Sequence, residues 1–430
     1  MDYSIADYEK QAAEIFPKLL KYFKEWGNGW QVGNVFDTLT DYIFRYPEQQ
    51  SDIGEVVRAA EEQWGKIQGS MCWYDDWGWW GIASVKAFDS EYEKFFEPYV
   101  KVFQDRANLT CWNTMIFGKA PSDKNPYKYK GGPNVWDNRD DGSIPGYFTS
   151  SAGWAAPRFP GGVWQYDMWQ GVRKAPECTP NHDPEHDEDK LSDPKSPHCP
   201  LGPYQLTVMN GLYFELALRL LLKNEGKGTP KAVYDELAFL VNWINLLGDH
   251  SLLQRFSDDI TLVRERVATY ASPQGNEDYP LVEGYHPGDA WCGDQGLILG
   301  GLLDFLLTGA KDPHIQALAI AIARGVLLRM VDANNVVMPY SRGFDVHNDP
   351  DDYSCGSGVF WRYLLRGFNQ NAALRKEVLD MIRENPTGNP IVMSADNPYA
   401  HAPFNHDLFR EFNALSVLLT AIEILKEANK

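Results

Sequence analysis

One stretch is apolar on nearly every side of the helix that its pattern predicts: Gly296-Leu297-Ile298-Leu299-Gly300-Gly301-Leu302-Leu303-Asp304-Phe305-Leu306-Leu307. A helix of this kind has no polar face to turn to water, so other elements must cover it on all sides. The stretch from Leu415 to Leu425 has the same character. At least two helices are therefore expected to lie inside a shell of others.

Other predicted helices are amphipathic. In the first, apolar residues recur on one face despite Pro17: Ala12, Ile15, Phe16, Leu19, Leu20 and Phe23. Further helices are predicted over residues 34–45, 52–67, 77–88, 90–107, 204–223, 229–247, 293–309, 312–331, 356–368, 371–385 and 406–428, about twelve in all with the first. This alternation of buried and half-exposed helices predicts an all-α fold, the (α/α)6 toroid, in which an inner ring of helices lies inside an outer ring.

The domain organisation is predicted to be simple. No linker and no sequence repeat of solenoid type is visible, so we expect one domain over 1–430 with an irregular loop insertion at about 118–203. The insertion is rich in Gly, Pro, Asn and Asp, and Cys178 and Cys199 near its end are expected to approach each other. The histidines and carboxylates between them match neither a zinc nor an EF-hand spacing, which favours a solvated loop over a metal site. We predict no metal and no cofactor.

Charge and composition limit the partners. The formal net charge of −19 disfavours a nucleic acid, which needs basic patches, and an anionic membrane surface, so a neutral substrate fits best. No apolar run of about 18 residues is present. The N-terminal segment does not resemble a signal peptide, so we expect a cytoplasmic protein, or a secreted or periplasmic one if a leader has been removed. The oligomeric state stays open.

Two adjacent carboxylates occur inside a cluster of aromatic residues, Met71-Cys72-Trp73-Tyr74-Asp75-Asp76-Trp77-Gly78-Trp79-Trp80. Rings stack on the C–H faces of a sugar, and a pair of carboxyl groups supplies the acid and the nucleophile or base of glycosidic-bond cleavage. The alternative is that Asp75 and Asp76 only cap a helix that begins near Trp77. A cap needs no aromatic surroundings, so the cluster favours a carbohydrate substrate.

Several motifs in order resemble glycoside hydrolase family 76, the α-1,6-mannanases, over roughly residues 70 to 425. They are Tyr74-Asp75-Asp76-Trp77-Gly78-Trp79-Trp80, Gly161-Gly162-Val163-Trp164, Met209-Asn210-Gly211-Leu212, Gly293-Asp294-Gln295-Gly296 and Gly358-Val359-Phe360-Trp361-Arg362. The resemblance implies an (α/α)6 barrel and cleavage of α-mannosidic, in particular α-1,6, linkages with retention of configuration. It also implies that Asp75 is the nucleophile and Asp76 the acid/base. Mutual repulsion and burial should raise one of the two pKa values, and the sequence leaves open which.

Further residues are candidates for contact with the sugar. They are Trp79, Trp80, Trp164, Asn210, Trp291, Asp294 and Gln295. Each has a structural alternative: Asn210, Asp294 and Gln295 could cap helices, and the tryptophans could pack in the core. Arg362, on an apolar helix, is expected to be a structural ion-pair partner.

Two rival functions remain at this stage. Trp77 and Asp294 stand where the family usually has other residues, and a glycan-binding protein without turnover could keep the aromatic cleft. A sugar epimerase of the N-acylglucosamine type shares a helical toroid and transfers protons through histidines, although the Asp pair argues against it.

Overall fold

The computed structural model describes residues 4–25, 29–46, 53–67, 74–88, 96–115, 206–224, 229–246, 248–266, 286–342, 344, 353–399 and 407–430. Within them the inner ring consists of α2 (Gly29–Arg45), α4 (Tyr74–Lys86), α9 (Thr207–Leu222), α11 (Cys292–Leu307), α14 (Gly356–Gln370) and α17 (Asp407–Ala428). The outer ring consists of α1 (Ile5–Glu25), α3 (Ile53–Ile67), α6 (Val100–Met115), α10 (Pro230–Ile244), α12 (Pro313–Arg329) and α15 (Ala372–Glu384).

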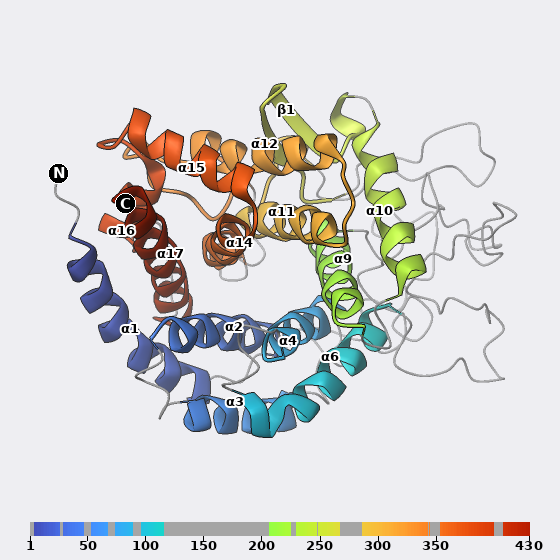
Figure 1. Cartoon of the computed structure of the whole chain (residues 1–430), viewed down its shortest axis with the longest axis vertical. Coiled ribbons are helices and arrows are strands. Elements are labelled where there is room, and N and C mark those ends of the chain that lie inside the picture. Colours follow the sequence, from blue (N-terminus) through green and yellow to red (C-terminus); the bar gives the residue numbers. More distant parts are fainter. Residues whose placement is uncertain are drawn as a thin grey trace, which may run out of the picture.

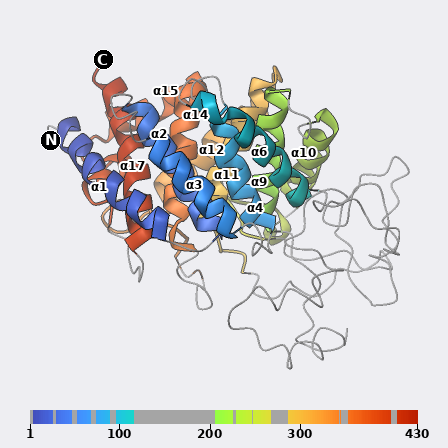
Figure 2. The ribbon, with the colours of Figure 1, turned by 90° about the horizontal axis from the view of Figure 1, so that it is seen from below.

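The six inner helices close a circle. Each packs against the next in the order α2, α4, α9, α11, α14 and α17, and α17 returns to α2 (Figure 1). The first and last helices of the chain, α1 and α17, also pack together, and the perpendicular view shows the helices as a single layer (Figure 2). The predicted all-α (α/α)6 toroid is confirmed.

Burial follows the two rings. Every residue of α11 from Cys292 to Phe305 is buried, as its all-round apolar sequence predicted. A Cβ on Gly296 would lie 2.9 Å from the Cα of Phe360, so the absence of a side chain there lets α11 approach the backbone of α14. On α15, by contrast, only Leu374, Val378 and Ile382 are buried, which is the single apolar face of an outer helix.

Helix starts follow local chemistry. The α10, α12 and short α16 (Pro390–Asp396) helices each begin with a polar N-cap followed by proline, and the N-cap residues are Thr229, Asp312 and Asn389. The helix predicted at 90–107 is interrupted and ends later than predicted; its residues 90–95 lie outside the described residues. A 3₁₀ turn over Glu97–Tyr99 precedes α6, which runs from Val100 to Met115, because Pro98 cannot lie in a helix interior.

Besides α16 and the 3₁₀ turn before α6, two further features of the described chain were not predicted. A 3₁₀ turn, η4 (Gly248–His250), leads into an antiparallel hairpin of β1 (Leu253–Ser257) and β2 (Ile260–Val263), in which Leu253 pairs with Val263. The hairpin lies beside α12, and β2 also contacts α11. The insertion at about 118–203, with Cys178 and Cys199, lies outside the described residues, so the single domain over 1–430 stays a prediction there. No described helix is both long and apolar enough to span a bilayer.

Candidate active site

The N-terminal ends of the inner helices carry a connected group of aromatic rings. Near the start of α2, Trp30 lies 6.1 Å from Trp79 of α4 and 6.4 Å from Phe409 of α17, measured between ring centroids. Trp79 also meets Trp291, the N-cap residue of α11, edge to face at 6.3 Å. Trp291 in turn contacts Tyr353, which precedes α14, at 6.2 Å. These five residues are the aromatic wall.

The two candidate catalytic carboxylates lie at the same end of the barrel. Asp75 and Asp76 occupy the first turn of α4, which begins at Tyr74 and not near Trp77. They therefore stand inside the helix and are not its N-cap. Asp75 is one helical turn before Trp79, so its side chain leaves α4 on the same face as the aromatic wall. A Cβ on Gly81 of this helix would lie 2.5 Å from a Leu216 methyl group, which shows how closely α4 approaches α9.

The electrostatic surroundings of Asp75 differ from those of an ordinary surface carboxylate. The residue is partly exposed, but its Oδ1 is buried and has no hydrogen-bond partner among the described residues. Burial raises the pKa of Asp75 to about 6, although the backbone N–H groups of Asp75 and Asp76 oppose the rise. A carboxyl group with this pKa can be ionised or protonated near neutral pH, which is what acid/base or nucleophilic chemistry on a sugar requires.

Asp294, on the first turn of α11, is a second carboxyl at this end whose oxygens lack partners. It is fully buried, and neither of its oxygens has a hydrogen-bond partner within the described part of the chain. Burial raises the pKa of Asp294 well above its usual range; the nearby Glu265 adds to the rise and Arg266 opposes it. This shift favours the protonated form, which can donate a hydrogen bond as well as accept one.

Glu265 was missed by sequence reasoning. It is buried, pairs with Arg266, and receives a hydrogen bond of 3.5 Å from the hydroxyl of Tyr353. Its backbone carbonyl accepts the N–H of Thr207, the first residue of α9. The only sequence signal was a charged pair directly after an apolar segment, because the hairpin that brings Glu265 to this end was not predicted.

Two predicted contact residues, Gln295 and Asn210, have hydrogen-bond partners within the fold. The Gln295 amide is fully buried: Oε1 accepts from Val263 N–H at 2.7 Å, and Nε2 donates to the Val263 carbonyl at 2.7 Å and to the Trp291 carbonyl at 3.0 Å. Asn210 is buried and donates to the Leu206 carbonyl at 2.7 Å. Gln295 thus ties α11 to β2, and Asn210 closes the first turn of α9.

Trp80 likewise lies in the core and not in the aromatic wall. Its indole N–H donates to the Gly29 carbonyl at 2.7 Å, and its ring packs 5.4 Å from Trp64 and 6.2 Å from Phe36. The next residue along a helix points about 100° away from its neighbour, so adjacent tryptophans on α4 cannot both face one site. Within the described residues Trp80 packs in the core, and its contact with a sugar stays a prediction.

Other predictions concern residues outside the described part. Trp164, in the insertion, and residues 71–73, directly before α4, both lie outside the described residues. A substrate cleft over the Asp pair therefore stays a prediction. Among the described residues, no group of three or more His, Cys, Asp or Glu side chains is arranged to hold a metal ion.

The fold was compared with known proteins. No protein-family model matches the sequence, and no curated protein matches it. Among solved structures, an α-1,6-mannanase from Salegentibacter sp. HEL1_6 has a TM-score of 0.58 at 12% identity, covering 96% of this chain and 99% of that one. A glycoside hydrolase family 76 α-mannanase from Bacteroides thetaiotaomicron has a TM-score of 0.51 at 11% identity, covering 99% and 98%. The Lin0763 protein from Listeria innocua has a TM-score of 0.52 at 13% identity, covering 93% and 86%. At these identities the likeness establishes the fold alone: the chain is an (α/α)6 toroid of the kind found in glycoside hydrolases.

Proposed function

We propose that the protein is a retaining glycoside hydrolase that cleaves α-mannosidic linkages, α-1,6 in particular, in neutral oligo- or polysaccharides. The observation that carries the proposal is the Asp75–Asp76 pair on the first turn of an inner helix, one turn from the aromatic wall. The glycosidase-like toroid supports it, as does the net charge of −19, which favours a neutral ligand. The motif resemblance around the pair supplies the family of the reaction.

The proposed reaction has two steps. In the first, the Asp75 carboxylate attacks the anomeric carbon while Asp76 gives its proton to the departing glycosidic oxygen, which leaves as the hydroxyl of the shorter sugar. A covalent mannosyl–Asp75 ester remains. In the second step Asp76 removes a proton from water, the resulting hydroxide attacks the same carbon, and the ester bond breaks to return Asp75 as a carboxylate. Two inversions at one carbon give net retention.

The pKa of Asp75 bears on the roles within the pair. A nucleophile must be ionised, so with a pKa of about 6 Asp75 is ready for attack above that pH. A raised pKa is also the mark of a general acid, which would assign the proton-donating role to Asp75 and nucleophilic attack to Asp76. The resemblance favours Asp75 as the nucleophile, and separate replacement of each residue distinguishes the two assignments.

The choice of sugar rests on the neighbours and on the wall. A variant of the Salegentibacter mannanase, described as inactive and altered at two consecutive aspartates, was solved in complex with α-1,6-mannotriose. An adjacent pair at the start of an inner helix supports the same use here. Trp79 and Trp291 are buried, at 2% and 5% exposure, so the partly exposed Trp30 and Tyr353 of the aromatic wall would offer their rings to a sugar.

The test is a screen over linkage-defined α-mannosides and α-glucosides with release of reducing sugar as the readout. Cleavage of α-1,6-mannobiose or longer oligomers is expected. Conversion of a free sugar without bond cleavage would indicate the epimerase, and binding without product would indicate a glycan-binding protein. Asp380→Asn is a matched control, because Asp380 pairs with Lys376 on the exposed face of outer helix α15 and should leave activity unchanged.

A further inference from the structure

A cavity of about 100 Å³ lies inside the barrel at the end opposite the Asp pair. It is lined by residues of α2, α4, α9, α14 and α17, and it opens beside the exposed Asn369 and Gln370, the last residues of α14. We call it the lumen cavity. Its lining is densely charged: Arg45, Lys86, Arg219, Arg362 and Arg366 face Asp37, Asp41 and Glu423. Behind the lining, Glu215 pairs with Arg219 and Asp304 pairs with Arg366.

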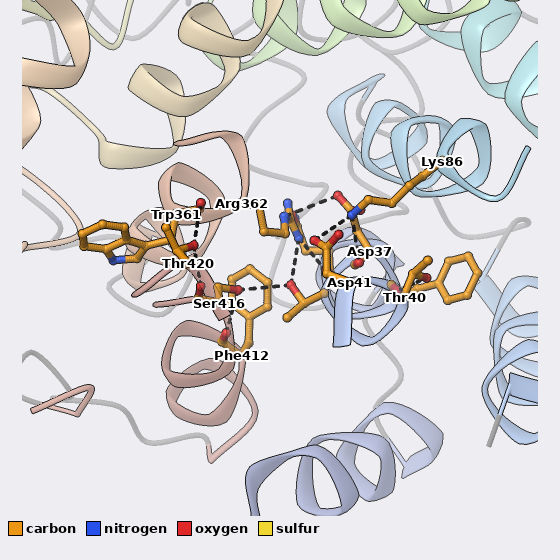
Figure 3. A network of polar contacts seen from close by, with 12 residues as sticks. Asp37, Thr40, Asp41, Lys86, Trp361, Arg362, Phe412, Ser416 and Thr420 are labelled. Atoms are coloured by element: carbon orange, nitrogen blue, oxygen red, sulfur yellow. Dashed lines mark hydrogen bonds and ion pairs between the residues drawn. The ribbon is translucent and has the colours of Figure 1, made fainter. Parts of the chain in front are cut away.

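Ion pairs balance most of the positive charge. Lys86 of α4 reaches Asp37 and Asp41 of α2 (Figure 3). Arg219 pairs with Glu215 and Asp304, Arg366 with Asp304, and Arg45 with Glu423. Arg362 of α14 donates to the Asn34 carbonyl at 2.6 Å. Burial alone would raise the pKa of Asp37, but Arg362, Lys86 and Arg219 lower it to about 2, so this carboxylate is ionised. The C-terminal ends of the inner helices also favour cations.

Four hydrogen-bond donors of the lining remain without an acceptor among the described residues. They are Arg45 Nε, Arg219 Nη1, Arg362 Nε and the hydroxyl of Tyr363. Arg362 Nε is 3.3 Å from Asp37 Oδ2, but the two do not form a hydrogen bond. Tyr363 is 2% exposed and Arg219 5%. Buried donors without acceptors are costly, and a group with several acceptor oxygens in the cavity that they line would reduce this cost.

We propose that the lumen cavity binds a small inorganic oxyanion of the size and charge of phosphate. Guanidinium groups match the oxygen geometry of such an anion, and Tyr363 supplies a further donor. The cavity volume of about 100 Å³ is several times what one water molecule needs, so a tetrahedral oxyanion has room there. An anion held there joins α9 to α14 and completes a polar network that the protein alone leaves open. The proposal is independent of the reaction at the Asp pair.

Inorganic phosphate titrated against thermal unfolding, at constant ionic strength set with sodium chloride, tests the proposal. Phosphate is expected to raise the melting temperature of the wild-type protein in a saturable way. Tyr363→Phe should weaken the apparent phosphate affinity about tenfold, because one donor to a charged ligand is lost. Without phosphate the variant should melt at or above the wild-type temperature, since the hydroxyl that it removes has no protein acceptor.

Tyr213→Phe on α9 is the control, because its hydroxyl donates to the Ala232 carbonyl away from the cavity and its loss should leave phosphate affinity unchanged. Crystals grown with selenate should show an anomalous peak within hydrogen-bond distance of Arg219 and Tyr363. A phosphate response that is absent, or equal in wild type and Tyr363→Phe, would overturn the proposal. The proposal would also be overturned if crystals grown at a saturating selenate concentration showed only water in the cavity.

Discussion

Two carboxylates in opposite halves of the inner ring have pKa values that are shifted in opposite directions. At the N-terminal ends Asp75 has a buried oxygen with no partner among the described residues, and burial raises its pKa to about 6. Asp37, near the middle of α2 and in the lining of the lumen cavity, is buried, but three cations lower its pKa to about 2. The first carboxyl can change its protonation near neutral pH, whereas the second stays an anion. The difference lies in the neighbours, because cations act on Asp37 while burial dominates at Asp75.

The largest expected effect on stability comes from removing a cation from the lining of the lumen cavity. Arg362→Met removes hydrogen bonds to Asn34 and the ion pair with Asp37, and leaves that carboxylate buried with fewer partners. We expect a loss of about 3–5 kcal/mol in the free energy of unfolding, measured by urea denaturation. Arg324→Met, which removes a partly exposed partner of Asp259 on the outer surface, should cost less than about 1 kcal/mol. Equal losses would contradict a special role for the inner network.

Asparagine at the two aspartates should change stability in opposite directions. Asp75 has its folded pKa raised from 3.8 to about 6, so its ionisation penalty is absent below pH 3.8 and complete above pH 6. Asp75→Asn should therefore stabilise the protein by about 1–3 kcal/mol at pH 7, and the gain should vanish near pH 4.

Asp37 has its folded pKa lowered from 3.8 to about 2, so its stabilisation is complete above pH 3.8 and lost as the pH falls through 2. Asp37→Asn should destabilise by roughly 2–3 kcal/mol at pH 7 and have less effect near pH 2. Unfolding curves at several pH values measure both variants. Higher stability of Asp37→Asn at pH 7, or lower stability of Asp75→Asn, would show that the two environments are not as different as described.

The neighbours Asp294 and Gln295 sharpen the comparison within one helical turn. Gln295→Leu leaves the N–H and carbonyl of Val263 without their partner and should cost about 1–3 kcal/mol in stability, with little change in KM. Asp294→Asn should raise the free energy of unfolding at pH 7, because it removes a buried ionisable carboxyl that has no hydrogen bond to lose among the described residues, and it should alter KM for the oligosaccharide. Unfolding and steady-state kinetics on both variants provide the measurement. If Gln295→Leu changed KM as much as Asp294→Asn, Gln295 would be a sugar contact after all.

The fold could be predicted because its signals are local. All-round apolar helices such as α11 imply an inner ring, and Arg362 on such a helix is the ion-pair partner that the sequence predicted. The β1–β2 hairpin was not predicted, because Leu253–Ser257 and Ile260–Val263 are short and their pairing depends on the packing of α12.

The candidate site could be predicted only in part. A motif identifies Asp75 and the aromatic cluster, but it does not say which face of α4 each tryptophan takes. Trp79 belongs to the aromatic wall and contacts Trp291, whereas Trp80 lies in the core and donates to the Gly29 carbonyl. Glu265 and the partners of Gln295 come together only through tertiary contacts across the chain, which no local pattern records.

The most direct test of the central claim compares Asp75→Asn with Asp76→Asn on a dinitrophenyl α-mannoside, whose leaving group needs little protonation. The account predicts no turnover for Asp75→Asn on any substrate. It predicts that Asp76→Asn forms and accumulates the mannosyl–enzyme, detected by intact mass, and that added azide releases a mannosyl azide of retained configuration. Swapped behaviour would reverse the roles within the pair. Near wild-type rates for both variants would contradict the account, because the pair would then be only part of a helix.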